Sequence, residues 1–312
     1  MRVVFMGTPE FSVGTLERLI EAGHEVIGVV TQPDKPKGRG KVMQLTPVKE
    51  KALEYNIPVY QPFKVKEEAF IKELKAMEPE VIVVVAFGQI LPKSILDMPK
   101  YGCINVHASL LPKLRGAAPI EWSIINGEKE TGITTMFMDV GLDTGDMLLK
   151  SITAIEPTDT GATLRDRLSV MGADLLIETL EGLEAGTIKR EKQKDEDSTY
   201  VKMLTKSLGE IDFTKSAVEI ERLVRGLNPW PSAYTSLHGK TLKIWSAKVL
   251  SGDEKGKPGE VVEVTKKSLV VQTGEGRLSL LELQLEGKKR MEVDVFLRGY
   301  EVAEGTMLQN KE

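Results

Sequence analysis

The chain has 312 residues, of which 41% are hydrophobic and 28% are charged, and its formal net charge is −4. This composition excludes an intrinsically disordered chain, and the acidic balance excludes a protein that coats nucleic acid over its whole surface. The single cysteine excludes an internal disulfide framework, and three histidines with that cysteine are too few, at unsuitable spacings, for a zinc site, so we expect no metal.

The chain begins with a predicted strand, residues 2–6, and not with the basic and apolar segments of a signal peptide. No apolar run approaches the roughly 18 residues that span a membrane. We therefore predict a cytoplasmic protein without a membrane segment, and a monomer as the simplest oligomeric state.

The turn after this strand, residues 7–11, has one glycine and a proline where a dinucleotide-binding protein carries G-x-G-x-x-G. No G-x-x-x-x-G-K-[ST] loop for nucleotide phosphates occurs elsewhere in the chain. Nicotinamide, flavin and ATP are therefore not expected as ligands.

Short apolar runs alternate with segments of helical spacing in the first half of the chain. This alternation predicts an α/β domain with a Rossmann-like, mostly parallel, doubly wound sheet, whose ligands bind at the carboxyl ends of the strands. Further strands are predicted at residues 25–31, 80–86 and 102–108, and helices at residues 11–22, 46–55 and 66–77.

A basic loop, residues 33–41, follows the second predicted strand. Its residue types alone favour a solvated surface loop, because charged segments with glycines between elements are usually exposed. The loop sets four basic residues against Asp34, namely Lys35, Lys37, Arg39 and Lys41.

The strand at 102–108 carries Asn105 and His107, and a Ser109–Pro112 turn follows it. Side chains two apart in a strand share a face, so an amide donor and a titratable imidazole would lie side by side. That pair suits acyl chemistry. A strand histidine taken alone is more often a structural residue, so this prediction depends on its neighbours.

An acidic, glycine-rich loop, residues 139–146, supplies Asp143. Its carboxylate would complete an amide, imidazole and carboxylate set if the loop lay near His107. The alternative is a local turn, since aspartates in such loops often bond to their own backbone.

The composition of the sequence changes after a predicted helix at residues 160–182, and this change divides the chain. The run 189–197 is highly charged and is typical of a linker, and short strands with glycine turns follow it, as in a small β-barrel of OB-fold character. We predict a Rossmann-like domain at 1–186, a linker at 187–206 and an OB-fold-like domain at 207–312. The second domain is expected to hold a helix at 216–226 and strands at 234–237, 242–247, 259–264, 268–273 and 277–284, with Trp230 as a barrel anchor.

The first domain closely resembles the folate-dependent formyltransferases. Those enzymes carry an Asn-x-His on a strand, a Ser-Leu-Leu-Pro turn and an Asp in a D-x-G-x-D-x-G loop, and the likeness continues through residues 113–120. The resemblance implies formyl transfer from 10-formyltetrahydrofolate to an amine. It implies catalytic roles for Asn105, His107 and Asp143.

Formyl transfer requires stabilisation of a developing oxyanion and movement of protons between two nitrogens. A preorganised donor such as Asn105 is commonly worth about 10²- to 10³-fold in rate. Asp143 beside His107 would favour the imidazolium and would relay protons, and His107 acting as a neutral base is the alternative that the residues leave open.

The resemblance also implies which residues bind the folate. Backbone and aliphatic groups suit a flat heterocycle, although the leucines and Ile90 could equally be core residues. The implied set is Ser109, Leu110, Leu111, Pro112, Phe87, Gly88, Gln89, Ile90, Leu91, Asp139 and Gly141.

Residues 31–41, 224–233 and 287–291 resemble the members of this family that formylate methionine carried by initiator tRNA, the step that prepares it for translation initiation. The likeness implies that the basic loop inserts into the tRNA, with Arg39 as the inserting residue. For each basic residue of the second domain, the alternative is a surface charge that only keeps the protein soluble. The implied tRNA-binding set is Lys35, Lys37, Arg39, Lys41, Lys202, Lys206, Arg225, Lys288 and Lys289, with Arg222 and Arg290 as further members of the same basic path.

Two other functions stay open at this point. A related formyltransferase acting on an amino-sugar nucleotide or on glycinamide ribonucleotide would share the same three catalytic residues. A non-catalytic tRNA-binding or folate-sensing protein would have no use for them together.

Overall fold

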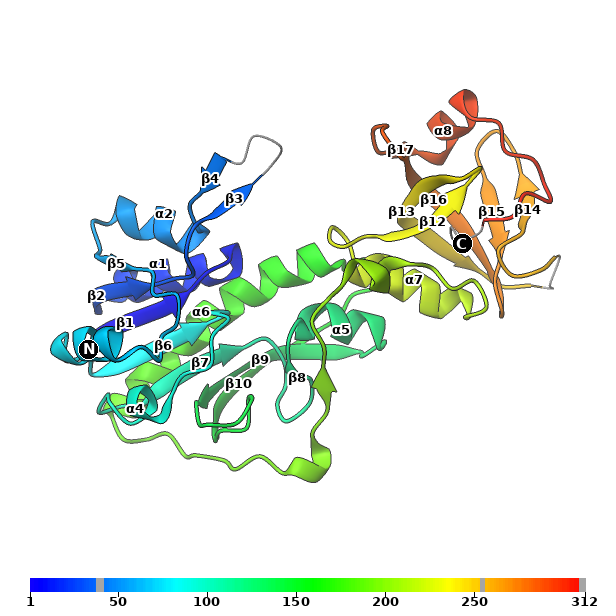
Figure 1. The fold of residues 1–312 in the computed structure, drawn as a ribbon. Coiled ribbons are helices and arrows are strands. Elements are labelled where there is room, and N and C mark those ends of the chain that lie inside the picture. Colours follow the sequence, from blue (N-terminus) through cyan, green and yellow to red (C-terminus); the bar gives the residue numbers. More distant parts are fainter. Residues whose placement is uncertain (38–41, 253–255, 309–312) are drawn as a thin grey trace. The chain divides into compact units, whose positions relative to one another are not determined.

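The computed structural model describes residues 1–37, 42–252 and 256–308. The chain forms two compact units, each made of several segments (Figure 1). The first unit comprises Met1–Gly116, Thr131–Thr153 and Arg165–Val201, and the second comprises Ala117–Glu130, Ala154–Leu164 and the chain from Lys202 onward. This division differs from the predicted scheme of 1–186, 187–206 and 207–312, because two segments within residues 1–186 join the second unit.

The first unit is built on a seven-stranded sheet with the strand order β10-β9-β7-β6-β1-β2-β5. The pairings β7–β6, β6–β1, β1–β2 and β2–β5 are parallel, whereas β9 runs antiparallel to β7. The predicted mostly parallel α/β sheet is confirmed, and β9 and β10 are strands that the periodicity did not reveal. The strands are β1 (Arg2–Gly7), β2 (Glu25–Val30), β5 (Val59–Tyr60), β6 (Val81–Val85), β7 (Cys103–His107), β9 (Glu130–Phe137) and β10 (Met147–Ala154).

Helices pack on both faces of this sheet. On one face Phe70 and Leu74 of α3 join a buried cluster with Ile82 and Cys103. On the other face Gly172 of α6 lets the helix approach Val106, whose Cγ1 would lie only 2.9 Å from an added Cβ. The helices are α1 (Val13–Glu21), α2 (Pro47–Glu54), α3 (Glu68–Ala76), α4 (Lys93–Leu96) and α6 (Gly161–Glu184), and a 3₁₀ turn, η1 (Glu10–Ser12), precedes α1.

Two small sheets complete the first unit. β3 (Lys35–Lys37) and β4 (Val42–Gln44) form an antiparallel hairpin from the predicted basic loop. β8 (Arg115–Gly116) pairs in parallel with β11 (Tyr200–Val201), so part of the predicted linker is a strand that belongs to the first unit.

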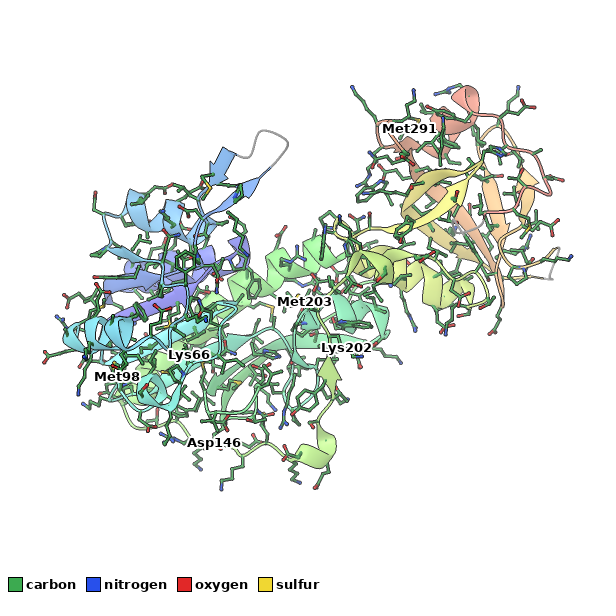
Figure 2. The ribbon with its side chains drawn as sticks, viewed as in Figure 1. Lys66, Met98, Asp146, Lys202, Met203 and Met291 are labelled. Carbon is green, nitrogen blue, oxygen red and sulfur yellow. The ribbon has the colours of Figure 1, made fainter. Side chains whose placement is uncertain are left out.

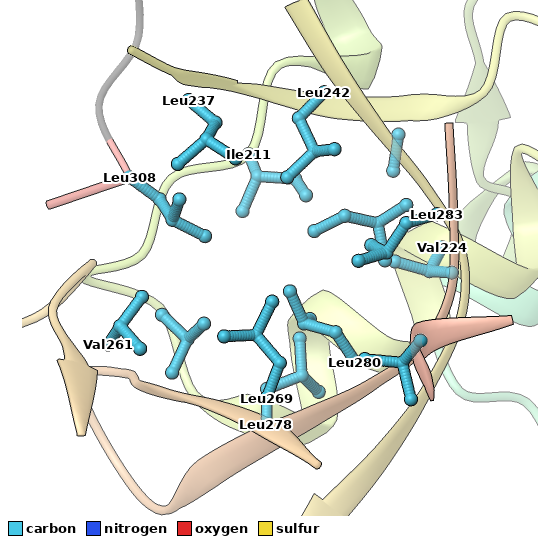
Figure 3. Close-up of a cluster of buried hydrophobic side chains, with 14 of the residues drawn as sticks. Ile211, Val224, Leu237, Leu242, Val261, Leu269, Leu278, Leu280, Leu283 and Leu308 are labelled. Carbon is cyan, nitrogen blue, oxygen red and sulfur yellow. The ribbon is translucent and has the colours of Figure 1, made fainter. Parts of the chain in front are cut away.

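The second unit contains a six-stranded antiparallel sheet, in which five strands have the order β12-β13-β16-β15-β14 and the sixth, β17, pairs with β16. Its core is filled by aliphatic side chains such as Leu242, Leu269 and Leu280 (Figure 3). The predicted strand-rich second domain is thus confirmed. Its elements are α5 (Pro119–Ile125), η3 (Lys206–Gly209), α7 (Ala217–Gly226), β12 (Ala233–Leu237), β13 (Lys240–Leu250), β14 (Val261–Val264), β15 (Leu269–Gln272), β16 (Arg277–Leu285), β17 (Met291–Glu292) and α8 (Val293–Gly299).

Trp230 is not a core anchor of this unit, so that prediction is wrong. Its side chain is 54% exposed. Trp230 lies between Pro229 and Pro231 in the turn before β12, and prolines lack the amide hydrogen that would draw the turn into the sheet. Within the described ranges no helix is both long and apolar enough to cross a bilayer.

Candidate functional site

Asn105 and His107 lie at the carboxyl end of β7, on the sheet face that also carries Cys103. Asn105 is placed between Val84 of β6 and Met136 of β9 by the strand register. The Asn105 side chain is half-buried and bonds to no other described residue, so its amide is free to donate to a bound molecule.

His107 is buried and is fastened through one ring nitrogen. Its Nε2 lies 3.0 Å from the carbonyl oxygen of Leu114. A carbonyl only accepts hydrogen bonds, so Nε2 carries the proton, and this partner assigns the tautomer. The other nitrogen, Nδ1, lies 3.8 Å from Oδ2 of Asp143, which is an ion-pair distance longer than a hydrogen bond. Nδ1 is therefore the nitrogen free to take up or release a proton.

Asp143 projects from the loop between β9 and β10, and its φ of +55° is left-handed. The same Oδ2 accepts the amide hydrogen of Gly116 at 2.8 Å. The structure therefore brings Asp143 to His107, as expected. The local-turn role is filled by Asp139 instead, whose Oδ1 accepts from Gly141 at 2.9 Å and Thr144 at 2.7 Å.

The turn at 109–112 is held by Thr134 of β9. Its hydroxyl donates to the Ser109 carbonyl at 2.7 Å and accepts from the Leu111 amide at 3.1 Å. The Ser109 hydroxyl donates to the Lys113 carbonyl. Leu111 is buried and Leu110 is half-buried, so this turn presents Leu110 and backbone groups outward. The peptide bond between Leu111 and Pro112 is cis.

The segment 87–91 divides between core and surface. Phe87 and Leu91 are core residues. Gly88 and Ile90 are exposed, and the Ile90 side chain is 78% exposed. Gln89 is a tether, because its carboxamide accepts from the Val65 amide at 2.9 Å. Only Gly88 and Ile90 of this segment are thus oriented to touch a ligand.

The base of the β3–β4 hairpin is a hydrogen-bonded charge pair. Lys49 donates to Asp34 and to Gln61. The hydrogen bond from Lys49, followed by that from Gln61, lowers the pKa of Asp34. Lys35 is exposed on β3. Arg39 and Lys41, with the side chain of Lys37, lie outside the described residues.

Four predicted tRNA-contacting lysines of the second unit are exposed, and Lys202 is labelled beside Met203 in Figure 2. They are Lys202, Lys206, Lys288 and Lys289. Three arginines of the same prediction have internal partners. Arg225 is paired with Glu221 and donates to the Asp159 carbonyl at 2.9 Å. Arg290 pairs with Glu282 and lies 4.7 Å from the Trp245 ring centre. Arg222 packs over Gly127.

Thr134, Leu114, Gly116 and Gln193 are residues of this site that the sequence did not reveal. Thr134 lies in an unpredicted strand, and Gln193 lies in the charged run whose composition predicts a linker. Leu114 and Gly116 act through backbone atoms, which no residue pattern reports. Across the described ranges no group of three or more His, Cys, Asp or Glu side chains is arranged to hold a metal ion.

Comparisons with known proteins identify the family of this chain. The model of the formyl transferase family matches residues 1–180, and that of the formyl transferase C-terminal domain matches residues 203–301. A protein of Agathobacter rectalis named methionyl-tRNA formyltransferase is 61% identical over 98% of this chain and 99% of its own length. A Clostridioides difficile protein of the same name is 52% identical over 99% of this chain and all of its own length.

Two solved structures share the fold. A sugar 3N-formyl transferase crystallised with dTDP and 5-N-formyl-THF superposes with a TM-score of 0.68 at 19% identity, covering 93% of this chain and 99% of that one. HypX from Aquifex aeolicus in complex with tetrahydrofolic acid gives 0.61 at 16% identity, covering 99% of this chain and 51% of that one. With both domain models matched in order and near-full-length relatives above half identity, the chain belongs to the formyl transferase family.

Proposed function

We propose that this protein transfers the formyl group of 10-formyltetrahydrofolate to the α-amine of methionine on initiator methionyl-tRNA, giving N-formylmethionyl-tRNA for translation initiation. The observation that carries the proposal is the facing pair of His107 and Asp143 beside the Asn105 amide, which bonds to no other described residue. The full-length likeness to relatives named methionyl-tRNA formyltransferase selects the acceptor.

The three side chains divide the work of acyl transfer between two nitrogens. Asn105 donates a hydrogen bond to the formyl oxygen as negative charge develops on it. Nδ1 of His107 exchanges the proton that leaves the attacking amine, since Nε2 is committed to Leu114. Asp143 stabilises the charged imidazole in the low-dielectric surroundings of that buried ring.

The formyl donor is a flat pterin with a charged tail, and the exposed groups around the site fit it. Ile90, Val140 and Leu142 are large apolar side chains that remain more than half exposed. Such side chains beside free backbone groups suit a heterocycle that stacks and hydrogen bonds. We propose that these residues, with Leu110 and Gly88, contact the donor, and that Asp139 and Gly141 shape the covering loop.

The tRNA contacts are proposed for two separate surfaces. On the first unit, the β3–β4 hairpin presents Lys35 above its charged base. Arg39, which lies outside the described residues, is the proposed inserting residue. On the second unit, Lys202, Lys206, Lys288 and Lys289 would neutralise phosphates. We leave Arg225 out of this surface, because its guanidinium already holds Glu221 and Asp159. We expect a cytoplasmic monomer, since the acceptor is a cytoplasmic aminoacyl-tRNA.

Sugar nucleotides and glycinamide ribonucleotide are the competing acceptors. The structural likeness to a sugar 3N-formyl transferase, at 19% identity, shows the fold alone. A binding protein without activity is also disfavoured, because binding alone does not need an amide, an imidazole and a carboxylate together in one site.

One assay tests the proposal against these alternatives. The purified protein is incubated with 10-formyltetrahydrofolate and, in parallel, with initiator methionyl-tRNA, an amino-sugar nucleotide or glycinamide ribonucleotide. We expect formylated product with methionyl-tRNA only. Product with either nucleotide and none with methionyl-tRNA would refute the assignment, and no product in any arm would favour a binding role.

A further inference from the structure

Residues 191–201, which we call the strap, contact two parts of the site in the first unit. These parts are the turn that binds His107 and the loop that carries Asp143. At the start of the strap, Glu191 and Met147 exchange backbone hydrogen bonds at 2.8 and 2.9 Å. At its end, Tyr200 and Val201 form β11 against β8. The strap is thus anchored at both ends within one compact unit.

The strap holds the turn that fixes His107. The Thr199 hydroxyl accepts from the Leu114 amide at 2.8 Å, and the Thr199 carbonyl accepts from the Arg115 amide at 2.8 Å. Leu114 has a left-handed φ of +57° and uses its own carbonyl to bind His107 Nε2. Thr199 therefore stabilises the backbone conformation that presents this carbonyl to the imidazole.

The strap also holds the loop that carries Asp143. The side-chain amide of Gln193 donates to the carbonyl of Asp143 at 2.7 Å and to that of Gly145 at 2.8 Å. Both donors of one half-buried carboxamide are thus spent on the loop backbone. Two bonds from one rigid group restrain both the position and the direction of the loop.

Arg115 connects the turn that binds His107 to Gln193, the strap residue that holds the Asp143 loop. Its Nε donates to Gln193 Oε1 at 2.9 Å, and its Nη1 donates to Asp195 at 3.0 Å and to the Tyr200 hydroxyl at 2.9 Å. Its side chain is only 1% exposed, and Nη2 has no partner among the described residues. An unpaired buried donor lowers stability, so packing alone does not favour an arginine here.

We propose that Gln193 and Arg115 are positioning residues that set the separation of His107 and Asp143, with Gln193 holding the Asp143 loop and Arg115 coupling it to the His107 turn. This proposal rests on the proposed formyl transfer for its kinetic consequence. Neither residue touches the reacting atoms. Their effect comes through geometry, since displacement of a reacting group by about 1 Å can cost roughly 10²-fold in rate.

Two variants of Gln193 separate positioning from general stability. Gln193→Met keeps the length of the side chain but removes all its hydrogen bonds. Gln193→Glu keeps an acceptor for Arg115 and turns carboxylate oxygen toward the loop carbonyls, so the Arg115 link stays while the loop loses its donors. Lys194→Met, at the exposed neighbour in the same strap, is the matched control.

We measure hydrogen exchange of segments 112–116 and 139–146, thermal unfolding, and steady-state formylation of methionyl-tRNA. We expect both Gln193 variants to speed exchange in 139–146 and to lower kcat by about 10-fold or more, with KM values within about 2-fold, while Lys194→Met changes neither. Formylation is measured at temperatures well below the melting temperature of each variant, so the loss of kcat cannot follow from unfolding.

Unchanged exchange in 139–146 for both Gln193 variants would overturn the positioning role, whatever the substrate proves to be. So would a kcat within about 2-fold of the parent enzyme in an active preparation. A parent enzyme that forms no product with methionyl-tRNA would instead refute the proposed function, and the exchange measurement would still decide the role of Gln193.

Discussion

His107 and Asp143 face each other through Nδ1 and Oδ2 because each is held by a backbone group of the same turn. The imidazole is held by its Nε2 on the Leu114 carbonyl, and the carboxylate is held by the Gly116 amide on the very oxygen that faces the ring. Leu114 and Gly116 are two residues apart in one turn. A single short stretch of backbone therefore sets both members of the pair.

Replacement of Asp143 by asparagine should abolish most of the activity without unfolding the protein. An asparagine oxygen still accepts from Gly116, but the negative charge that faces the imidazole is gone. Proton transfer by a positioned group contributes about 10²- to 10⁴-fold, so we expect kcat to fall by at least about 10²-fold. Asp146→Asn, in the same loop (Figure 2), is the control and should retain near-parental turnover.

Asn105→Ala tests the amide as an oxyanion donor. No described residue depends on this side chain for a hydrogen bond, so its removal should leave the melting temperature unchanged within a few degrees. Loss of a preorganised donor predicts a kcat lower by about 10²- to 10³-fold. Turnover close to that of the parent in steady-state assays would remove Asn105 from the mechanism.

Thr134→Val should weaken binding of the formyl donor. The change keeps the shape of the side chain but leaves the Ser109 carbonyl and the Leu111 amide without their partner. We expect a stability loss of about 1–3 kcal/mol and a higher KM for 10-formyltetrahydrofolate.

Its neighbour Thr135 provides a matched control, because its hydroxyl bonds to Thr179 and to the Leu149 amide, away from the turn. Thr135→Val should cost similar stability in chemical denaturation. An equal rise in KM for both variants would show that the effect is general.

The paired change Lys288→Ala with Lys289→Ala should reduce the salt dependence of tRNA binding. Removal of a lysine that neutralises a phosphate lowers the slope of log K against log salt by about 0.7 to 0.9. Filter binding between low and moderate salt measures the slope. The control is the double variant Lys266→Ala with Lys267→Ala, an exposed pair in another turn of the same unit, and it should leave the slope unchanged. Equal slopes in the two double variants would contradict the assignment.

Cys103 should make the protein less stable at alkaline pH. Burial, aided by Asp97, raises the pKa of its thiol from 9.0 to about 12. Below pH 9 both states hold the proton, and between pH 9 and 12 only the unfolded state releases it, so stability falls as pH rises.

From pH 7 to pH 10 this thiol should lower the free energy of unfolding by about 1.4 kcal/mol. Denaturant titrations of the parent and of Cys103→Ala at both pH values isolate the effect, since the variant lacks it. The same pH loss in both proteins would assign it to other groups.

The sequence alone predicted the part of the site that depends on local periodicity. Asn105 and His107 share a face because a strand alternates with a period of two, and β7 obeys that rule. The contact with Asp143 was expected only from the resemblance to a family. Its physical cause is the antiparallel pairing of β9 with β7, a long-range feature that no local pattern reports.

The strap escaped prediction for a related reason. Its charged residues are typical of a solvated linker, and most of them are indeed exposed. The residue that matters is Gln193, a neutral side chain whose partners are backbone carbonyls of a distant loop. The prediction for Trp230 was wrong for a different reason. Large aromatic residues usually fill cores, but in this core the aromatic positions belong to Phe213 and Phe296, and the other members are aliphatic.

The second unit is formed by three separate segments of the chain, and this limits where two family members can be joined in a chimaera. Helix α5 packs against α7, where Gly226 allows Ile125 to approach, yet α5 is encoded far upstream of the remaining second unit. A chimaera joined at residue 203, where the C-terminal family model begins, would pair the α7 of one parent with the α5 of another. A stable chimaera would therefore need the α5 segment to come from the same parent as α7.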